Sequence, residues 1–503
     1  MFTNMIQSII DRFHQTPNAT AIVSQKGTIS FHTLGERIQA VCSALAERTP
    51  NFAVIYGHKE LDTVASIIAC TFSGIPFSVV DTANPAERVK QILSIHNSDL
   101  VILGSGSCSR DFLENTHDLL VPSLSSEPYR QHSWTPPPAQ DTFYVLTTSG
   151  SSGAPKGVRI SYDNYGHFHQ WYGQLLKDNA AQGGHVNHAC LSFDMGILDL
   201  FSTLAAGQAV FMLPHAFNAL PRQNIKLLMQ GGTTTPSNWF STPSFLEMMC
   251  LDPLFSESSF PSLTLFFVGG EFVSPKLIQT LTERFPKATI RHAYGPTETT
   301  CVTHAHPITV TEPSALLSLG APLGNNRIQI EDESGECLAP YQVGEVVIYG
   351  EQVGQGYVPP EHPRNIAFGQ QANTRFYKTG DFGYVDDFGH LFLKGRVDGQ
   401  IKWRGNRVEL TEIETVAAQA DIVTHSAVVP IFDNNTISEL ILFTQLERTT
   451  AENKTRFNQH LREHLPQYMV PSTVHFLDNV PMNLHGKIDR NQLKNDWERA
   501  QRH

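Results

Sequence analysis

Short runs of consecutive apolar residues recur through the first two thirds of the chain. They occupy residues 52–56, 100–103, 209–213 and 263–268, and segments of helical periodicity separate them. Apolar runs of this length are typical of strands buried on both faces, as in parallel sheets that helices cover. The pattern therefore predicts alternating strands and helices built around parallel sheets.

The beginning of the chain carries an apolar stripe at helical spacing. Met5, Ile9 and Phe13 recur every fourth residue, and no basic segment followed by an apolar one precedes them. We expect an amphipathic first helix here and not a leader peptide. The longest apolar stretch, residues 61–80, contains Asp62 and a Gly-Ile-Pro interruption. It is too interrupted to span a bilayer, so we expect no membrane insertion.

From about residue 318 the pattern changes. Residues 328–330 and 345–349 form short apolar segments, and the segment 383–393 carries the turn sequence Asp-Asp-Phe-Gly at its centre. Such segments predict short antiparallel strands and hairpins. Further on, helical patterns recur near 410–419 and 453–464.

These patterns together predict an α/β protein of two domains. Residues 1–397 are expected to form a large N-terminal domain of two helix-covered, mostly parallel sheets, with a small β-barrel-like sheet at about 318–397. Residues 398–503 are expected to form a small α+β C-terminal domain. A chain of 503 residues is also too long for a single core.

Composition narrows the class of protein. The chain has 36 Lys and Arg against 48 Asp and Glu, a net charge of −12, which argues against nucleic-acid binding or membrane binding through bulk charge. Its seven cysteines are scattered, odd in number and without a Cys-x-x-Cys pair. This usage indicates reduced thiols in a cytoplasmic enzyme, not a disulfide framework or a zinc site.

A Gly/Ser/Thr-rich loop closed by a lysine lies between two apolar segments, at residues 147–157. Glycine amides, hydroxyls and a lysine suit a polyphosphate. A Walker P-loop requires Ser or Thr after the lysine, whereas Pro155 precedes Lys156 and Gly157 follows it. The loop is thus either a phosphate-binding loop of another kind or a surface hairpin of small residues.

Further polar clusters follow at residues 292–298, 377–381, 395–402 and 485–490. Each is weak evidence alone, since a Thr-Gly-Asp sequence is more often a turn than a site. Their order and spacing, however, resemble those of the adenylate-forming superfamily of acyl-CoA synthetases, firefly luciferase and peptide-synthetase adenylation domains. The resemblance covers nearly the whole chain.

A closer likeness is to the D-alanine–D-alanyl carrier protein ligases. It is carried by Trp-Phe-Ser-Thr-Pro-Ser-Phe at 239–245, by Glu-Arg-Phe-Pro-Lys-Ala at 283–288 and by Leu-Pro-Gln-Tyr-Met-Val-Pro at 465–471. The resemblance implies a reaction in two halves: a carboxylate attacks the α-phosphate of ATP in the presence of Mg²⁺, and a phosphopantetheine thiol then displaces AMP from the acyl-adenylate.

The resemblance also implies roles for particular residues. The loop residues that would embrace the β- and γ-phosphates are Thr147, Thr148, Ser149, Gly150, Ser151, Ser152, Gly153 and Lys156. Thr297 would contact the α-phosphate, and Glu298 would hold Mg²⁺. The residues at the nucleoside would be Ala293, Tyr294 and Gly295 at the adenine, with Asp381 and Arg396 at the ribose. Lys487 would bridge the attacking carboxylate and the phosphate, and Asp398 would be the hinge before the C-terminal domain.

Asp194 matches the position where amino-acid-activating members of the superfamily pair the substrate ammonium. Ligases of aryl and fatty acids have no use for this anion, which would be buried without a partner. The alternative is a structural Asp that caps the following helix. The positions expected to contact the substrate side chain are all apolar or small: Met195, Leu198, Phe267, Gly269, Ala293, Cys301 and Val302.

Some residues depart from the pattern of the D-alanine ligases. Those ligases have a Cys where this chain has Gly269, a change that we expect either to admit a larger side chain or to relax stereochemical choice. The other departures are Gly196, His292 and His485, and none of them removes a charged catalytic group.

The thiol acceptor is expected to be a separate phosphopantetheinylated carrier protein, because the chain shows no carrier, condensation or thioesterase motif. Arg404 and Arg407 beside Lys402 are either a docking patch for an acidic carrier or an ordinary solvated face. Two other functions stay open: a CoA ligase for a small carboxylic acid, and a catalytically silent scaffold that binds nucleotide or carrier.

Overall fold

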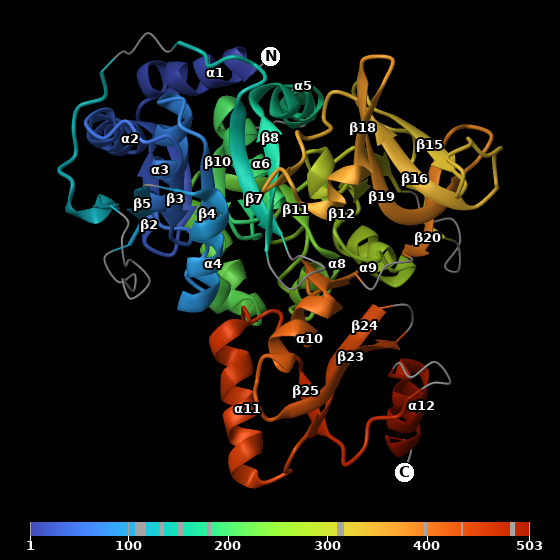
Figure 1. Ribbon diagram of the computed structural model, residues 1–503. Helices are drawn as coiled ribbons and strands as arrows, with labels where there is room; N and C mark the ends of the chain where they lie inside the picture. The colour runs from blue at the N-terminus through green and yellow to red at the C-terminus, as the bar shows by residue number, and fades with distance from the viewer. Residues whose placement is uncertain are drawn as a thin grey trace. The chain divides into compact units, whose positions relative to one another are not determined.

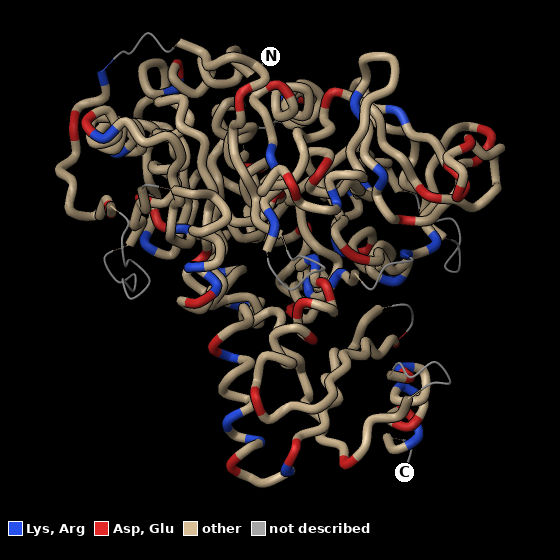
Figure 2. The backbone as a smooth tube through the Cα atoms, viewed as in Figure 1, with Lys and Arg blue, Asp and Glu red and all other residues tan. Residues whose placement is uncertain are grey.

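The computed structural model describes residues 2–98, 100–105, 117–130, 135–148, 155–178, 183–308, 316–396, 400–433, 436–482 and 488–501. The chain divides into two compact units (Figure 1). Unit 1 comprises Met1–Thr82, His96–Thr147 and Gly157–Val397, and unit 2 comprises Ala83–Ile95, Thr148–Lys156 and Asp398–His503. Figure 2 shows basic and acidic positions interspersed along the backbone of both units.

Unit 1 contains two large sheets rich in parallel pairs. Among the described residues, the first has eight strands in the order β14 (His304–Pro307), β13 (Thr289–Tyr294), β12 (Leu265–Gly269), β11 (Thr235–Ser241), β9 (Gly183–Asn187), β10 (Ala209–Met212), β1 (Thr20–Ser24) and β2 (Gly27–Ser30). Only its outermost described pairs, β13–β14 and β1–β2, are antiparallel.

The second large sheet has seven strands within the described part of the chain. Their order is β17 (Tyr357–Val358), β8 (Lys156–Ser161), β7 (Thr142–Thr148), β4 (Phe77–Val80), β3 (Ala53–Tyr56), β5 (Leu100–Leu103) and β6 (His117–Leu120). The strands β3, β4 and β5 are buried at every position. The apolar runs at 52–56 and 100–103 predict this for β3 and β5, whereas β4 also buries the polar residue Ser78.

A smaller antiparallel sheet follows in the chain. As far as the structure describes it, it has five strands: β15 (Arg327–Glu331), β16 (Gly344–Tyr349), β18 (Phe368–Gln371), β19 (Thr374–Val385) and β20 (Leu391–Arg396). The strands β19 and β20 form the hairpin that the Asp-Asp-Phe-Gly turn predicts.

Helices cover both large sheets (Figure 1). Those of unit 1 are α1 (Phe2–Gln15), α2 (Phe31–Ala46), α3 (Leu61–Phe72), α5 (Tyr162–Asp178), α6 (Asp194–Ala205), α7 (Pro221–Leu228), α8 (Pro243–Met249) and α9 (Pro275–Arg284). Caps fix where they begin: Ser30 accepts a hydrogen bond from the amide of Thr33 at the start of α2, and Ser274 precedes the proline that opens α9.

The strand β12 shows why the eight-stranded sheet is covered on both faces. Leu265 and Phe267 pack into a core that α1, α5 and α6 share with strands of both large sheets. Phe266 and Val268 face the other way, into a second core with side chains from α7, α8 and α9. The period of two along a strand therefore supplies two hydrophobic faces from one segment.

Unit 2 is a small α+β unit. It contains α4 (Ala86–His96), α10 (Leu410–Ala418), α11 (Ala451–His464) and α12 (Arg490–Ala500), with strands β21 (Gln400–Trp403), β22 (Asn406–Glu409), β23 (Val423–Asp433), β24 (Thr436–Leu446) and β25 (Thr473–Phe476). Val428 and Leu440 face a core with α10 and α11, whereas Val429 and Ile441 face α12.

The fold thus confirms the predicted class, with parallel-rich sheets in the large part of the chain and a smaller α+β part after it. Within the described residues, no helix combines the length and apolarity needed to cross a membrane.

Candidate active site

Several residues with expected roles lie where a strand of the eight-stranded sheet ends or the helix α6 begins. The strand β13 ends at Tyr294, and α6 begins at Asp194. Carboxyl ends of parallel strands are where α/β sheets place their ligands. After β13 the chain turns sharply at Gly295, where a Cβ atom would lie 1.8 Å from the carbonyl oxygen of Cys301. Only glycine fits this close approach, which brings Thr297 and Glu298 next to the sheet.

Asp194 and Thr297 lie in direct contact although 103 positions separate them. The Thr297 hydroxyl donates to Oδ2 of Asp194 at 2.6 Å, and Oδ1 of Asp194 accepts the backbone amide of Met195 at 2.8 Å. Asp194 is the first residue of α6, whose N-cap is Phe193, so it does not occupy the expected capping position. Its carboxylate instead accepts a hydrogen bond from an amide of the first helical turn and also faces the residue expected at the α-phosphate.

The expected ribose residues form one hydrogen-bonded group. The carboxylate of Asp381 accepts the Tyr294 hydroxyl at Oδ2 and Nη1 of Arg396 at Oδ1, both at 2.6 Å. Asp381 and Arg396 are cross-strand partners on β19 and β20. Burial, and then the charge of Asp381, raise the pKa of Tyr294 well above its ordinary value, so this phenol stays a donor. The arrangement holds a carboxylate in place to accept hydroxyl groups.

Glu298 is a fully buried carboxylate held by a tyrosine. The Tyr357 hydroxyl donates to Oε1 of Glu298 at 2.5 Å, and the Tyr377 hydroxyl lies 2.9 Å from that of Tyr357. A hydrogen-bonded carboxylate of this kind provides hard oxygen ligands, the type that Mg²⁺ binds. Its donor chemistry therefore fits the role expected for Glu298.

The residues expected to contact the substrate side chain are buried and mostly share one apolar cluster. Six of these expected residues belong to the apolar cluster: Met195, Leu198, Phe267, Ala293, Cys301 and Val302. An amino acid with a charged side chain would find no partner among them.

Gly269 does not widen this pocket. A Cβ atom at Gly269 would lie 2.2 Å from the carbonyl oxygen of Ala293 on the neighbouring strand β13. The expectation that the missing side chain admits a larger substrate is therefore wrong, because backbone already fills that space. Gly196 is similar, since its Cβ would lie 2.1 Å from the carbonyl oxygen of Cys190. Both departures from the pattern of the D-alanine ligases are tied to close backbone contacts.

The loop that carries part of this pocket is strained. Thr300 and Cys301 have φ angles of 58° and 63°, a left-handed conformation that is unfavourable for non-glycine residues and especially for a β-branched one. Such strain costs about 1–3 kcal/mol per residue and persists where surrounding structure enforces it. Gln352 supplies this support: its side-chain amide donates to the carbonyl oxygens of Thr299 at 3.4 Å and Val302 at 3.0 Å.

Some residues of this site gave no signal in the sequence. Gln352 and Tyr357 come from segments without a motif, and only the fold brings them to Glu298 and its loop. Tyr144 is a further case, because it is fully buried and its hydroxyl has no hydrogen-bond partner within the described residues. Burial, followed by neighbours that include Asp194, raises the pKa of Tyr144 well above its ordinary value. An isolated tyrosine in an apolar strand is typical of a hydrophobic core, so the sequence alone gives no reason to select Tyr144 as a site residue.

Several expected site residues lie outside the described residues. They are Ser149, Gly150, Ser151, Ser152, Gly153, Asp398 and Lys487. At the edges of the loop, Thr147 and Thr148 end β7 and are half-buried, and Lys156 begins β8 and is fully buried.

Three carboxylates, Asp194, Glu298 and Asp381, are each held by hydroxyl or guanidinium donors in this α/β fold, an arrangement that suits a nucleotide-binding enzyme. Comparison with protein families makes this specific. The AMP-binding enzyme family matches residues 10–358, and the AMP-binding enzyme C-terminal domain matches residues 412–487. The chain belongs to the AMP-binding enzyme family and is an AMP-forming ligase.

Individual relatives agree with this family. The chain is 31% identical to the D-alanine–D-alanyl carrier protein ligase of Bacillus licheniformis, over 97% of this chain and 98% of the relative. Among solved structures, it is similar to a Vibrio cholerae adenylation domain in complex with glycyl-adenosine-5′-phosphate. The TM-score is 0.86 at 20% identity, and the match covers 98% of this chain and 97% of that chain. It is also similar to an NRPS protein containing adenylation and PCP domains. The TM-score is 0.80 at 22% identity, and the match covers 98% of this chain and 97% of that chain. At these identities the solved structures support the fold.

Proposed function

We propose that the protein activates an amino acid as its aminoacyl-adenylate and then transfers it to the phosphopantetheine thiol of a separate carrier protein. The observation that carries this proposal is the position of Asp194. Its carboxylate contacts the hydroxyl of Thr297, while the other expected lining residues are apolar or small. A single anion in such a pocket suits the α-ammonium group of an amino acid.

The substrate is a small or apolar amino acid, with D-alanine as the first choice. Apolar lining disfavours charged side chains, and the close contact of Gly269 with Ala293 leaves no extra room at that position. The likeness to a D-alanine–D-alanyl carrier protein ligase over nearly the full chain supports the same choice and favours a separate carrier.

The chemistry needs no nucleophile or general base from the protein. The amino-acid carboxylate attacks the α-phosphorus and pyrophosphate leaves; the carrier thiol then attacks the acyl carbon and AMP leaves. Asp381 and Arg396 would hold the ribose, Thr297 would donate to the α-phosphate, and Lys487 would offset the charge that develops between carboxylate and phosphate. Catalysis is then positioning and electrostatics, as in other phosphoryl chemistry.

Glu298 would hold Mg²⁺ together with nucleotide oxygens and water. The fit rests on its oxygen donors and on the Tyr357 hydroxyl, which orients the carboxylate. When bound, the ion would neutralise phosphate charge. The cytoplasm suits such an enzyme, and none of the six cysteines in the described residues forms a disulfide bond.

Two substrates that differ only in the ammonium group test the role of Asp194. D-alanine and propionate share their carbon skeleton, so the ratio of their ATP–pyrophosphate exchange rates measures what the ammonium contributes. We expect the protein to prefer D-alanine by about 100-fold or more, since a site built for a polar group rejects the analogue that lacks it. Asp194→Asn keeps the shape of the side chain and an oxygen that can accept the hydrogen bond from the Thr297 hydroxyl. It should reduce the exchange rate with D-alanine while leaving that with propionate nearly unchanged.

A full panel of D- and L-amino acids and simple acids covers the alternatives. No exchange with any amino acid would contradict amino-acid activation, and exchange with propionate or an aryl acid alone would establish the CoA-ligase alternative. No exchange with any acid, in protein that still binds ATP, would establish the silent scaffold. If Asp194→Asn lowered the exchange rates with D-alanine and with propionate equally, Asp194 would have a structural role at the start of α6 and would not be the ammonium partner.

A further inference from the structure

A second polar cluster lies in unit 1, built around His58, Asp81 and His215, three residues for which the sequence predicted no role. His58 follows the end of β3 and Asp81 follows the end of β4, two neighbouring strands of the seven-stranded sheet. His215 and Cys190 follow β10 and β9, neighbouring strands of the eight-stranded sheet. The cluster therefore joins loops from the carboxyl ends of two different sheets, the place where α/β folds gather ligands.

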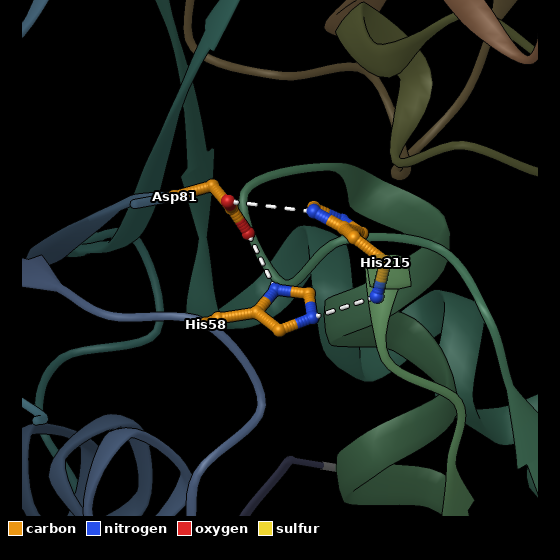
Figure 3. Close-up of side chains that lie close together, drawn as sticks. All are labelled: His58, Asp81 and His215. Carbon is orange, nitrogen blue, oxygen red and sulfur yellow. Dashed lines mark hydrogen bonds and ion pairs between the residues drawn. The ribbon is translucent and has the colours of Figure 1, made fainter. Parts of the chain in front are cut away.

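The imidazole rings of His58 and His215 pack against each other, with centroids 3.9 Å apart, and the Asp81 carboxylate contacts one nitrogen of each ring (Figure 3). Its Oδ2 is 2.7 Å from Nδ1 of His58, and its Oδ1 is 3.6 Å from Nδ1 of His215. One ligand atom from each of the three residues lies within 4.8 Å of the others. Three residues from separate loops thus aim nitrogen and oxygen atoms at one small volume.

The geometry points to a new site: we propose that His58, Asp81 and His215 bind a Zn²⁺ ion. Two imidazoles and a carboxylate are a common set of zinc ligands, with bonds of about 2.0–2.2 Å, which in a tetrahedron separate ligand atoms by about 3.3 Å. The separations of 2.7 Å to Oδ2 and 3.6 Å to Oδ1 of Asp81 lie on either side of this value, and the carboxylate would turn to present one of these oxygens to the ion. The side chains of His58 and Asp81 are 14% and 6% exposed, and that of His215 is 27% exposed, which leaves an approach for the ion and for a water ligand.

The hydrogen bonds around the rings show what zinc binding would change. Binding through Nδ1 places the ring proton on Nε2. For His215 this proton meets the sulfur of Cys190, which lies 2.7 Å from Nε2 and orients the ring as an outer partner. For His58, Nε2 accepts a hydrogen bond from the backbone amide of His215 at 3.2 Å in the absence of the ion. This long hydrogen bond would open on zinc binding, because Nε2 would then carry the proton. The ion would take the place of the proton that His58 now shares with Asp81.

The ion would act as a structural tie between the two sheets. It would link the loops after β3 and β4 to the loop after β10, so zinc binding would stabilise the folded state over the unfolded chain. The ammonium of Lys59 is buried close by and donates to the carbonyl oxygen of Asn187 at 2.8 Å. Because a neighbouring cation opposes the ion, we expect a dissociation constant on the order of micromolar and not the much tighter binding of thiolate-rich sites.

Metal titration of the full-length, tag-free protein tests the site. After EDTA treatment and its removal, we expect ZnCl₂ to bind in a 1:1 ratio by elemental analysis and to raise the thermal midpoint by several degrees. Co²⁺ should give the intense visible absorption of a tetrahedral site. His215→Gln should lose the bound ion, the thermal rise and the absorption together.

The chain offers a matched control. Asp163, His167 and Glu351 form another group whose ligand atoms lie within 4.8 Å, but Glu351 is exposed. His167→Gln should keep all three signals of the unaltered protein. Cys190→Ala should still bind zinc, about 10–100-fold more weakly, because it removes only the outer partner. The proposal is overturned if the unaltered protein binds no stoichiometric zinc, or if His215→Gln binds it as tightly as His167→Gln does.

Discussion

The hydroxyl of Tyr357 is the clearest case of one residue acting through another. It donates to Glu298, the carboxylate proposed to hold Mg²⁺, and would act on the ion through that carboxylate. Loss of an outer hydrogen bond of this kind costs about 10–100-fold in metal affinity. Tyr357→Phe should therefore raise the Mg²⁺ concentration needed for half-maximal pyrophosphate exchange by about 10-fold.

Tyr349→Phe is the matched control. Tyr349 is also buried and donates to a carboxylate, Oε1 of Glu331 at 3.1 Å, in the small antiparallel sheet. Its replacement should leave the Mg²⁺ dependence unchanged. Equal Mg²⁺ profiles for both variants would show that Tyr357 only fills space.

At the scale of elements, the turn after η4 (Thr297–Thr299) depends on Gln352. Gln352→Leu would leave the buried carbonyl oxygens of Thr299 and Val302 without their donor, at a cost of about 1–3 kcal/mol each. We expect a lower denaturant midpoint and a higher KM for the amino acid, because the strained residues 300–301 lose their support.

Gln371→Leu provides the comparison, since Gln371 lies exposed on β18. This change should alter the free energy of unfolding by less than about 0.5 kcal/mol. A normal KM in Gln352→Leu would show that the loop keeps its shape without the amide.

The sequence predicted elements well where one signal dominated. The apolar runs at 100–103 and 209–213 are β5 and β10, and the hairpin around 386–389 joins β19 to β20. Edge strands such as β17 were not predicted, because two residues carry no periodicity, and β17 forms by pairing with β8, about 200 positions away.

The site, like the fold, has residues that the sequence predicted and contacts that it did not. Asp194 and Thr297 were selected because their positions match those of the adenylate-forming superfamily, and Asp381 also because it follows a glycine in a polar cluster. The pairing of Asp194 with Thr297 was not predicted, because it depends on how α6 meets the end of β13. Gly269 was misread for a similar reason: a residue without a side chain gives no sign of which backbone lies beside it.

At the scale of the whole molecule, the proposed reaction uses both matched segments of the chain. Tyr294, proposed to lie at the nucleoside, is in the segment 10–358, and Lys487 is the last residue of the segment 412–487. Lys487→Ala should reduce ATP–pyrophosphate exchange by about 100-fold or more, because it removes a positive charge from the transition state of adenylation. Transfer from preformed aminoacyl-adenylate to the carrier should stay within a few-fold of normal.

Lys494→Ala controls for the loss of a lysine near the end of the chain. Lys494 lies on α12 and approaches Glu498 at 3.8 Å, a surface pair that contributes little. It should leave both half-reactions unchanged. An equal loss of both half-reactions in Lys487→Ala would assign Lys487 a general structural role.

The close contact between Gly269 and Ala293 also limits how substrate choice can evolve or be redesigned. Any side chain introduced at position 269 must be accompanied by a shift of β13, which also carries Tyr294 and leads into Thr297. With the roles proposed for these residues, we expect selectivity and nucleotide binding to be coupled at this strand. We expect positions 269 and 293 to covary among relatives, and selectivity libraries to succeed only when both positions are varied together.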